Sequence, residues 1–128
     1  MTAKEYQKLA NRTDAPLSDR YHSMGAIHML MGMTTEIGEL LDPYKKNLAY
    51  EKPIDFINVK EEIGDLMWYV ANFCNLNGFD LEEIMETNIK KLQERYPDKF
   101  DKVLAVQRNL NKEREILESE KSFEMLEG

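Results

Sequence analysis

Apolar residues recur along most of this chain at the three- and four-residue spacing of an amphipathic helix. The clearest stretch runs from about Asp55 to Leu76, and its apolar set is Ile63, Leu66, Met67, Val70, Phe73 and Cys74. The opposite face of the same stretch is polar and carries Glu62, Asp65, Tyr69 and Asn72. No alternation typical of a β-strand runs for a useful length in the sequence, so the pattern predicts an all-α protein.

Capping and breaking residues divide the chain into four predicted helices, at about 2–11, 21–41, 55–76 and 80–96. Thr2 and Asp80 each precede a glutamate by three positions, which is the spacing of a capping box at a helix start. Residues 12–19 are expected to form a loop, Pro43 to end the second helix, and Asn77-Gly78 to end the third.

The remaining segments complete a single predicted domain over residues 1–128. Residues 44–53 carry three lysines and are expected to form a basic linker, and the tail from 98 onward is helix-prone and then charged. We expect a bundle of four or five helices with its core at about 21–100, an N-terminal helix and loop at 1–20 and a helical tail at 101–128. The far end of that tail is expected to fray or to pack on another subunit.

Composition narrows the class of protein. The net charge of −7 argues against a general nucleic-acid binder, which needs a basic face. The single cysteine, Cys74, excludes an internal disulfide and a cysteine-rich zinc site, and its apolar surroundings predict a buried packing residue. The N-terminus lacks the apolar core of a secretory signal, and no stretch has the roughly 18 apolar residues of a membrane span. We therefore expect a cytoplasmic protein.

Two near copies of one pentapeptide carry the candidate chemistry: Glu36-Ile37-Gly38-Glu39-Leu40 and Glu62-Ile63-Gly64-Asp65-Leu66. Each sets two carboxylates three positions apart, on one face of a helix and beside an apolar stripe. Two such faces brought together form a four-carboxylate cluster that is stable only when cations fill it. Glu36, Glu39, Glu62 and Asp65 are therefore predicted ligands for Mg²⁺ or Mn²⁺, which prefer oxygen donors. The alternative is four solvated helix carboxylates.

A carboxylate-bridged di-iron site is the nearest rival, and it requires a Glu-x-x-His motif on each of two helices. The two histidines, His22 and His28, do not follow a glutamate by three positions. We expect both to be packing or surface residues.

The paired acidic motif resembles the signature of the MazG-like all-α nucleoside triphosphate pyrophosphohydrolases. Downstream, Asn88-x-x-Lys91 and the run Lys91-Leu92-x-x-Arg95-Tyr96-Pro97 resemble the segment that follows in that superfamily. The resemblance covers roughly residues 21–100. Thr35 departs from it, because the family often has a further glutamate before the first motif.

The resemblance implies Mg²⁺-dependent hydrolysis of a (deoxy)nucleoside triphosphate to a monophosphate and pyrophosphate, by a metal-activated water attacking the α-phosphorus. Glu36, Glu39, Glu62 and Asp65 would hold the metal, and one of them, or Glu61 if it turns inward, would orient the water. No protein nucleophile is needed, and the sequence shows no convincing Ser-His or Cys-His arrangement.

Substrate contacts are expected from residues on three segments. Asn88, Lys91 and Arg95 share one helix face, where Asn88 would touch metal or sugar and the two cations phosphates; otherwise this is a solvated face. Lys45 and Lys46 are weaker phosphate candidates. The base would contact Trp68, Tyr69 or Asn72, although Trp68 is equally suited to the core, and the pocket would include Met29, Gly32 and Met33.

Two further readings remain open. One is a relative with a narrower substrate, such as dUTP, dCTP or phosphoribosyl-ATP. The other is a non-catalytic helical protein whose acidic face docks a basic partner. The resemblance also implies a homodimer or homotetramer with sites completed across subunits, and the second helix, rich in methionine and apolar on more than one side, is compatible with that.

Overall fold

The computed structural model describes residues 1–14 and 22–119, and every regular element in these two ranges is helical. The elements are α1 (Ala3–Ala10), the 3₁₀ turn η1 (Asn11–Thr13), α2 (His22–Tyr50), α3 (Phe56–Asn77), α4 (Leu81–Arg95), α5 (Lys102–Val106) and α6 (Leu110–Ser119). The all-α prediction is confirmed.

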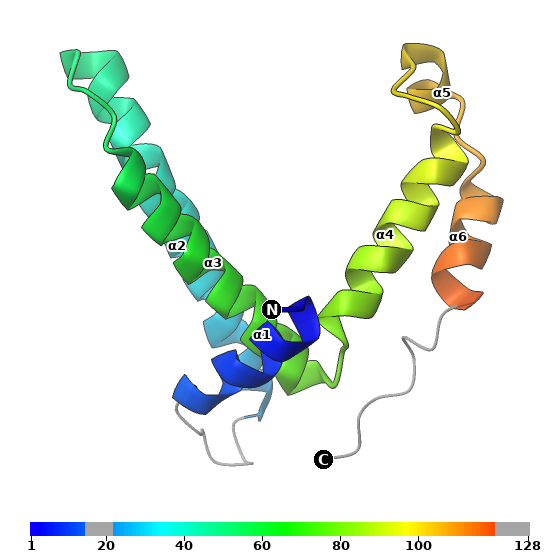
Figure 1. Ribbon diagram of the computed structural model, residues 1–128, viewed down its shortest axis with the longest axis horizontal. Helices are drawn as coiled ribbons and strands as arrows, with labels where there is room; N and C mark the ends of the chain where they lie inside the picture. The colour runs from blue at the N-terminus through cyan, green and yellow to red at the C-terminus, as the bar shows by residue number, and fades with distance from the viewer. Residues whose placement is uncertain (15–21, 120–128) are drawn as a thin grey trace.

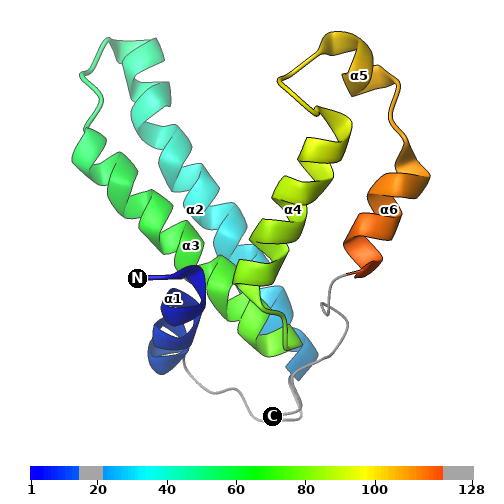
Figure 2. The same ribbon diagram turned by 45° about the vertical axis from the view of Figure 1, so that its right-hand side comes forward.

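The helices form an open V (Figures 1 and 2). The long antiparallel pair α2 and α3 makes one side, called the hairpin arm below. Helices α4 and α6 pack together as the second arm, with α5 at its far end, and α1 lies at the vertex. Within the described residues, α4 packs on α1 and α6 and makes no extensive contact with α2 or α3.

Three predicted helix boundaries are set by the residues that the sequence indicated. Thr2 and Glu5 form the capping box of α1, with Glu5 N donating to Thr2 Oγ1 at 3.1 Å and Thr2 N to Glu5 Oε2 at 2.7 Å. Asp80 caps α4 by accepting from the backbone of its first turn. Gly78 ends α3 at φ 67°, a left-handed conformation that glycine adopts without steric cost.

The predicted end of the second helix is wrong. Helix α2 continues through Pro43 to Tyr50, so Lys45 and Lys46 lie on a helix and not in a linker. Proline in a helix interior removes one backbone hydrogen bond and costs about 3 kcal/mol, and the extensive packing of α2 on α3 offsets this cost. Glu51 turns the chain at φ 55°, where the sequence offers no glycine to mark the stop.

The tail is helical, as expected, and it folds back on the second arm. Residues 102–119 form two short helices, and the second folds back along α4. A buried carboxylate holds it there: Glu113 accepts from Arg95 at 2.8 and 3.1 Å and from Arg108 at 2.6 Å. The expected loop at 12–19 begins with the 3₁₀ turn η1, and its residues 15–19 lie outside the described residues, as do residues 120–128 at the far end of the tail.

The core is small and sits at the vertex. Ala10, Ala71, Cys74 and Leu81 form it, from α1, α3 and α4, so Cys74 is the buried packing residue expected. The predicted apolar set of α3 is split, since Ile63 and Met67 are 47% and 37% exposed.

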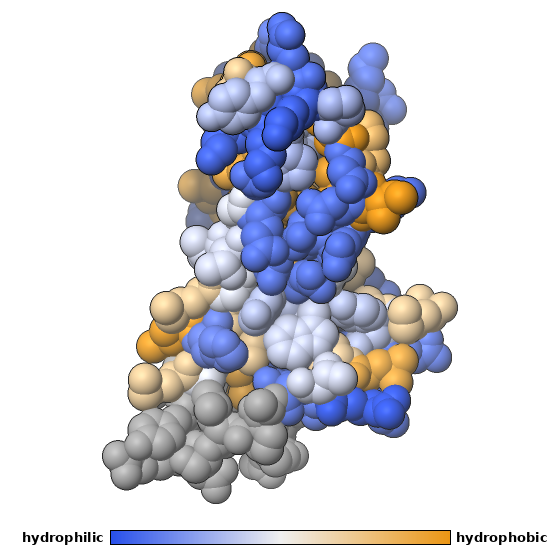
Figure 3. Space-filling model, turned by 90° about the vertical axis from the view of Figure 1, so that its left-hand side faces the viewer, coloured by the Kyte–Doolittle hydropathy of each residue, from blue (hydrophilic) through white to orange (hydrophobic). Residues whose placement is uncertain are grey.

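Large apolar side chains are exposed at helical spacing on both arms. They are Ile27, Leu30, Met31, Ile37, Leu41 and Leu48 of α2, Phe56, Ile57, Ile63 and Met67 of α3, and Ile84, Met85 and Ile89 of α4. The outward side of the hairpin arm is largely hydrophilic, with apolar residues at its margins and base (Figure 3). Among the described helices, none combines the length and apolarity needed to cross a membrane.

Candidate functional site

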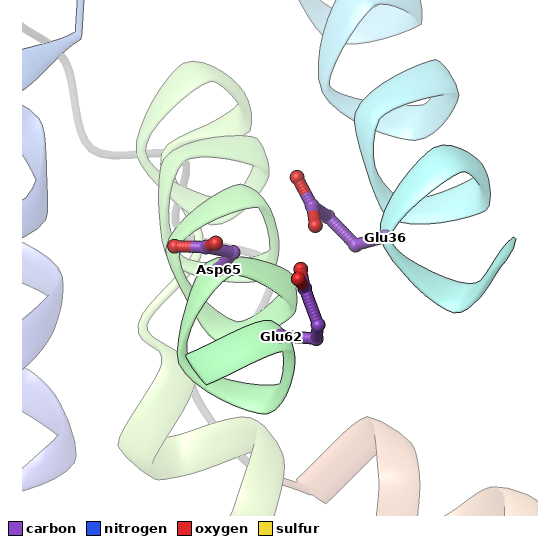
Figure 4. A group of neighbouring side chains, drawn as sticks. All are labelled: Glu36, Glu62 and Asp65. Atoms are coloured by element: carbon purple, nitrogen blue, oxygen red, sulfur yellow. The ribbon is translucent and has the colours of Figure 1, made fainter. Parts of the chain in front are cut away.

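Three carboxylates meet where α2 crosses the middle of α3. Glu36 comes from α2, and Glu62 and Asp65 come from successive turns of α3. Figure 4 shows the carboxylates of Glu36 and Glu62 facing each other, with that of Asp65 beside them. One oxygen from each residue lies within 4.8 Å of the others, a spacing at which a single cation can contact all three. The predicted convergence of the two pentapeptides therefore occurs within one chain.

The cluster is partly removed from water, and hydrogen bonds do not satisfy all of its carboxylate oxygens. Glu62 is buried and Glu36 half-buried, and one oxygen of each has no hydrogen-bond partner. A hydrogen bond with Glu39, burial and a hydrogen bond with Glu36 raise the pKa of Glu62 to about 7. Burial also raises the pKa of Glu36, with smaller contributions from Glu39 and Asp65. Like charges held this close favour either a shared proton or a bound cation.

The other two acidic candidates lie differently. Glu39 is exposed and is not one of the three converging residues, although its carboxyl group contributes to raising the pKa of Glu62. Glu61 precedes Glu62 directly, so it lies about 100° around the helix, and it is exposed and outside the cluster. Glu39 therefore lies beside the cluster, and Glu61 faces solvent.

The donor set suits a hard divalent cation. Carboxylate oxygens are the ligands that Mg²⁺ and Mn²⁺ prefer, and the two unpartnered oxygens of Glu36 and Glu62 supply unsatisfied acceptors. No histidine or cysteine belongs to the cluster, which disfavours zinc. The residues present therefore fit Mg²⁺.

The predicted phosphate-binding residues lie on the second arm, away from the carboxylates of the same chain (Figures 1 and 2). Asn88 is exposed and Lys91 half-buried, both on α4. The guanidinium of Arg95 is engaged by Glu113, whose side chain is 4% exposed. The structure does not bring these three residues to the carboxylates within one protomer, because α4 makes no extensive contact with α2 or α3 in the described residues.

Asn72 was expected to contact a base, and the structure gives it a different role. It is fully buried, its amide donates to the Ala10 carbonyl at 3.2 Å, and its Oδ1 accepts from Asn75 at 3.1 Å. Trp68 packs on the vertex core, and its indole N–H donates to Thr13 Oγ1 at 2.8 Å. Both side chains tie α3 to the N-terminal segment, which explains their polarity without a ligand.

Tyr69 and Gly32 lie one turn from the carboxylates, toward the vertex. A Cβ built on Gly32 would come within 2.1 Å of the Tyr69 ring, so the missing side chain admits this tyrosine. Tyr69 also meets His28 edge to face, with ring centroids 6.3 Å apart. Nearby on α2, Met29 is buried. Lys45 lies nine residues beyond Glu36 on the same helix, exposed near the tip of the arm.

Sequence reasoning missed three residues that bear on the site. Tyr6 of α1 donates to the Gly64 carbonyl at 3.4 Å, and burial together with the charge of Asp65 raises the pKa of Tyr6. Gln7 is buried at the vertex, and Glu113 is buried between two arginines. No local pattern singles these residues out, because their partners lie at least five and as many as 74 positions away.

Comparison with known proteins identifies the family of this chain. Residues 25–100 match the model of the MazG nucleotide pyrophosphohydrolase domain. The Gene 37 protein of Mycobacterium phage L5 is 32% identical over 75 residues, which is 56% of this chain and 66% of that protein, just under two thirds of its length. No solved structure matches. The matched residues contain the carboxylate cluster and all of α4, and the chain belongs to the MazG nucleotide pyrophosphohydrolase family.

Proposed function

We propose that this protein is a Mg²⁺-dependent nucleoside triphosphate pyrophosphohydrolase that converts a (deoxy)nucleoside triphosphate to the monophosphate and pyrophosphate. One observation carries the proposal: carboxylates of Glu36, Glu62 and Asp65 converge across two helices, with buried oxygens that have no partner. A solvated acidic face has no reason to bury such oxygens, because each one loses its hydration without compensation.

Glu36, Glu62 and Asp65 would hold Mg²⁺, with Glu39 adjacent. When bound, Mg²⁺ supplies neutralisation of phosphate charge and lowers the pKa of water. The residues themselves fix the position of the reaction, because they project from two packed helices and not from loops. Glu39 lies beside Glu62, and because the pKa of Glu62 is raised to about 7, Mg²⁺ would displace a proton from this ligand near neutral pH.

The phosphate side of the site would come from a second copy of the chain. The cations of α4 lie on the other arm, and both arms expose apolar side chains that a soluble protein ordinarily covers. In a homodimer, the second arm of one subunit would lie along the hairpin arm of the other. Asn88 and Lys91 of the partner subunit would then face the triphosphate held by these carboxylates.

Release of pyrophosphate from a panel of NTPs and dNTPs, with Mg²⁺ and with EDTA, tests the reaction. Metal-dependent release from one or several nucleotides supports the proposal, and the rank order separates a broad enzyme from one restricted to dUTP, dCTP or phosphoribosyl-ATP. Mg²⁺ binding without release from the ordinary nucleotides would direct the search to a specialised substrate. No release and no Mg²⁺ binding would contradict the proposal and favour an acidic docking protein.

Mixing two inactive variants tests the shared site. Glu62→Gln removes a carboxylate from one arm and Lys91→Ala a cation from the other. If each site uses both subunits, mixed dimers contain one site with neither change and regain part of the activity. If each site lies within one chain, the mixture stays inactive.

A further inference from the structure

Helix α1 lies outside the residues that match the family, and it is the element that joins the two arms. It packs along α3 and also contacts α4, while α4 makes no extensive contact with α2 or α3 in the described part of the chain. The direction of the second arm is therefore decided at the vertex and not by packing along the arms.

One side chain bridges that vertex. The Gln7 amide donates through Nε2 to the Phe79 carbonyl at 2.6 Å, and its Oε1 accepts from the Leu81 backbone N–H at 2.8 Å. These two backbone groups flank Asp80, the N-cap of α4. The Gln7 carbonyl in turn accepts from Asn75 Nδ2 at 2.9 Å, near the end of α3. Gln7 thus touches the last turn of α3, the connecting turn and the first residue of α4.

Two other side-chain contacts between the arms at the vertex are less directional. Lys4 pairs with Asp80 at 3.3 Å, but its side chain is 72% exposed, and such pairs contribute little. Leu81 packs among Ala10, Ala71 and Cys74, and apolar contacts of this kind hold a helix end without fixing its direction. The Gln7 bonds are short and its side chain is buried, so they define an angle as well as a contact.

We propose that Gln7 is a positioning residue that sets the angle between the hairpin arm and the second arm. The inference rests on the proposed function, in which carboxylates on one arm and Asn88 and Lys91 on the other serve the same nucleotide across two subunits. Through Gln7, helix α1, which lies outside the matched domain, would control the relative position of these carboxylates and cations.

Geometry makes this control effective. Lys91 lies ten residues beyond Leu81, which is about 15 Å along a helix, so a rotation of roughly 10° at the vertex moves it by about 2.6 Å. A displacement of about 1 Å in a substrate-positioning group can cost on the order of 100-fold in rate. The carboxylates of Glu36, Glu62 and Asp65 stay in place, because they belong to the hairpin arm alone.

Spin-label distances between the arms test the proposal in the full chain. Labels on cysteines introduced at Lys52 and Lys99, both exposed near the far ends of the arms, report the angle. The buried Cys74 thiol is 4% exposed and burial raises its pKa, so it reacts slowly with the label. Dilution with unlabelled chain restricts the signal to pairs within one protomer.

Gln7→Leu removes both side-chain bonds, and Lys4→Gln is the matched control on the same helix. We expect a single narrow distance in the parent and in Lys4→Gln, and a broadened or shifted distribution in Gln7→Leu. Mg²⁺ binding by the carboxylates should be unchanged, while kcat/KM for the nucleotide falls about tenfold or more. An unchanged distance distribution in a folded Gln7→Leu protein would overturn the proposal.

Gln7→Glu provides a milder variant and a rescue. A protonated carboxyl has the donor and acceptor of an amide, whereas a carboxylate cannot donate to the Phe79 carbonyl. We expect a broadened distribution at neutral pH that narrows toward the parent on acidification, with no such recovery in Gln7→Leu. A Gln7→Glu distribution that is broad at neutral pH and stays broad on acidification would contradict the assigned role. The distances and Mg²⁺ binding require no turnover, so this test stands apart from the test of the proposed reaction.

Discussion

The Tyr69 ring of α3 occupies the space that a side chain at Gly32 of α2 would need. The contact lets α2 and α3 pack closely one turn from Glu36 and Glu62. The packing of an aromatic ring on a glycine therefore helps to bring the two acidic motifs together. The space beside Gly32, a residue predicted from the sequence to line the substrate pocket, is filled by the Tyr69 side chain.

Gly32→Ala should therefore perturb the hairpin arm. The added methyl group would lie 2.1 Å from the Tyr69 ring, and displacing the ring should cost about 1–3 kcal/mol of unfolding free energy, measured in urea. Gly38→Ala is the matched control, because nothing lies within 4 Å of its new Cβ and helix propensity favours alanine by up to about 1 kcal/mol. Equal effects at the two glycines would contradict the assigned contact.

The pH dependence of Mg²⁺ binding follows from Glu62. Its pKa is raised from 4.5 to about 7, so the folded protein holds this proton more tightly than the unfolded chain does. Metal-free stability should therefore fall as the pH rises from about 4.5 to about 7 and then level off. Mg²⁺ competes with the same proton, so its affinity, measured by calorimetry, should rise between about pH 5.5 and about pH 7.5. Affinity independent of pH would show that Glu62 is not a ligand.

Neighbouring glutamates on α3 should behave differently. Glu62→Gln removes a cluster carboxylate and should abolish Mg²⁺ binding, and above pH 7 it should raise the melting temperature in metal-free buffer because it relieves repulsion with Glu36 and Glu39. Glu61→Gln changes an exposed residue outside the cluster and should leave both properties nearly unchanged. Loss of Mg²⁺ binding in Glu61→Gln would contradict the solvent-facing position of Glu61 and would support a direct role for it in the site.

Asn72→Ala should act on stability and not on substrate binding. It leaves the buried Ala10 carbonyl without this donor and removes the acceptor of Asn75, which should cost about 1–3 kcal/mol in denaturant unfolding. KM for the nucleotide should stay close to the parent value wherever the variant is folded. A selective rise in KM at unchanged stability would support the base contact that the sequence suggested.

Glu113→Gln should loosen the tail. Hydrogen bonds from Arg95 and Arg108 lower the pKa of Glu113 to about 2, so its contribution is present above the unfolded pKa of 4.5 and is lost as the pH falls toward 2. The variant should melt at lower temperature at pH 7, and hydrogen exchange in α6 should quicken while α2 and α3 stay protected. Unchanged exchange in α6 would show that packing alone holds it.

The sequence identified the helices wherever local chemistry decides them. Thr2, Asp80 and Gly78 act through backbone groups within a few residues, and each performs its predicted role. The boundary predicted at Pro43 is wrong, because long-range packing of α2 on α3 offsets the local cost of a proline inside the helix. The same contrast explains Ile63, whose apolar character indicates burial, although it is 47% exposed in the described part of one protomer.

In the candidate site, too, local spacing predicted some positions, while long-range packing decides the others. The spacing of the two acidic motifs predicted that Glu36, Glu62 and Asp65 would converge, since each motif fixes one helix face and the faces belong to adjacent helices. The separation of Asn88 and Lys91 from them depends on the angle at the vertex, and no local spacing encodes that angle. Gln7 acts over 72 and 74 positions of sequence, beyond any motif.

The most direct test of the central claim compares the parent protein with Glu62→Gln, following pyrophosphate and orthophosphate separately on a panel of nucleoside triphosphates. The account predicts that the parent releases pyrophosphate with Mg²⁺, that EDTA stops it, and that the folded variant releases none. Pyrophosphate release that persists in EDTA, or in Glu62→Gln at the parent rate, would contradict a metal-dependent reaction at the Glu36–Glu62–Asp65 cluster.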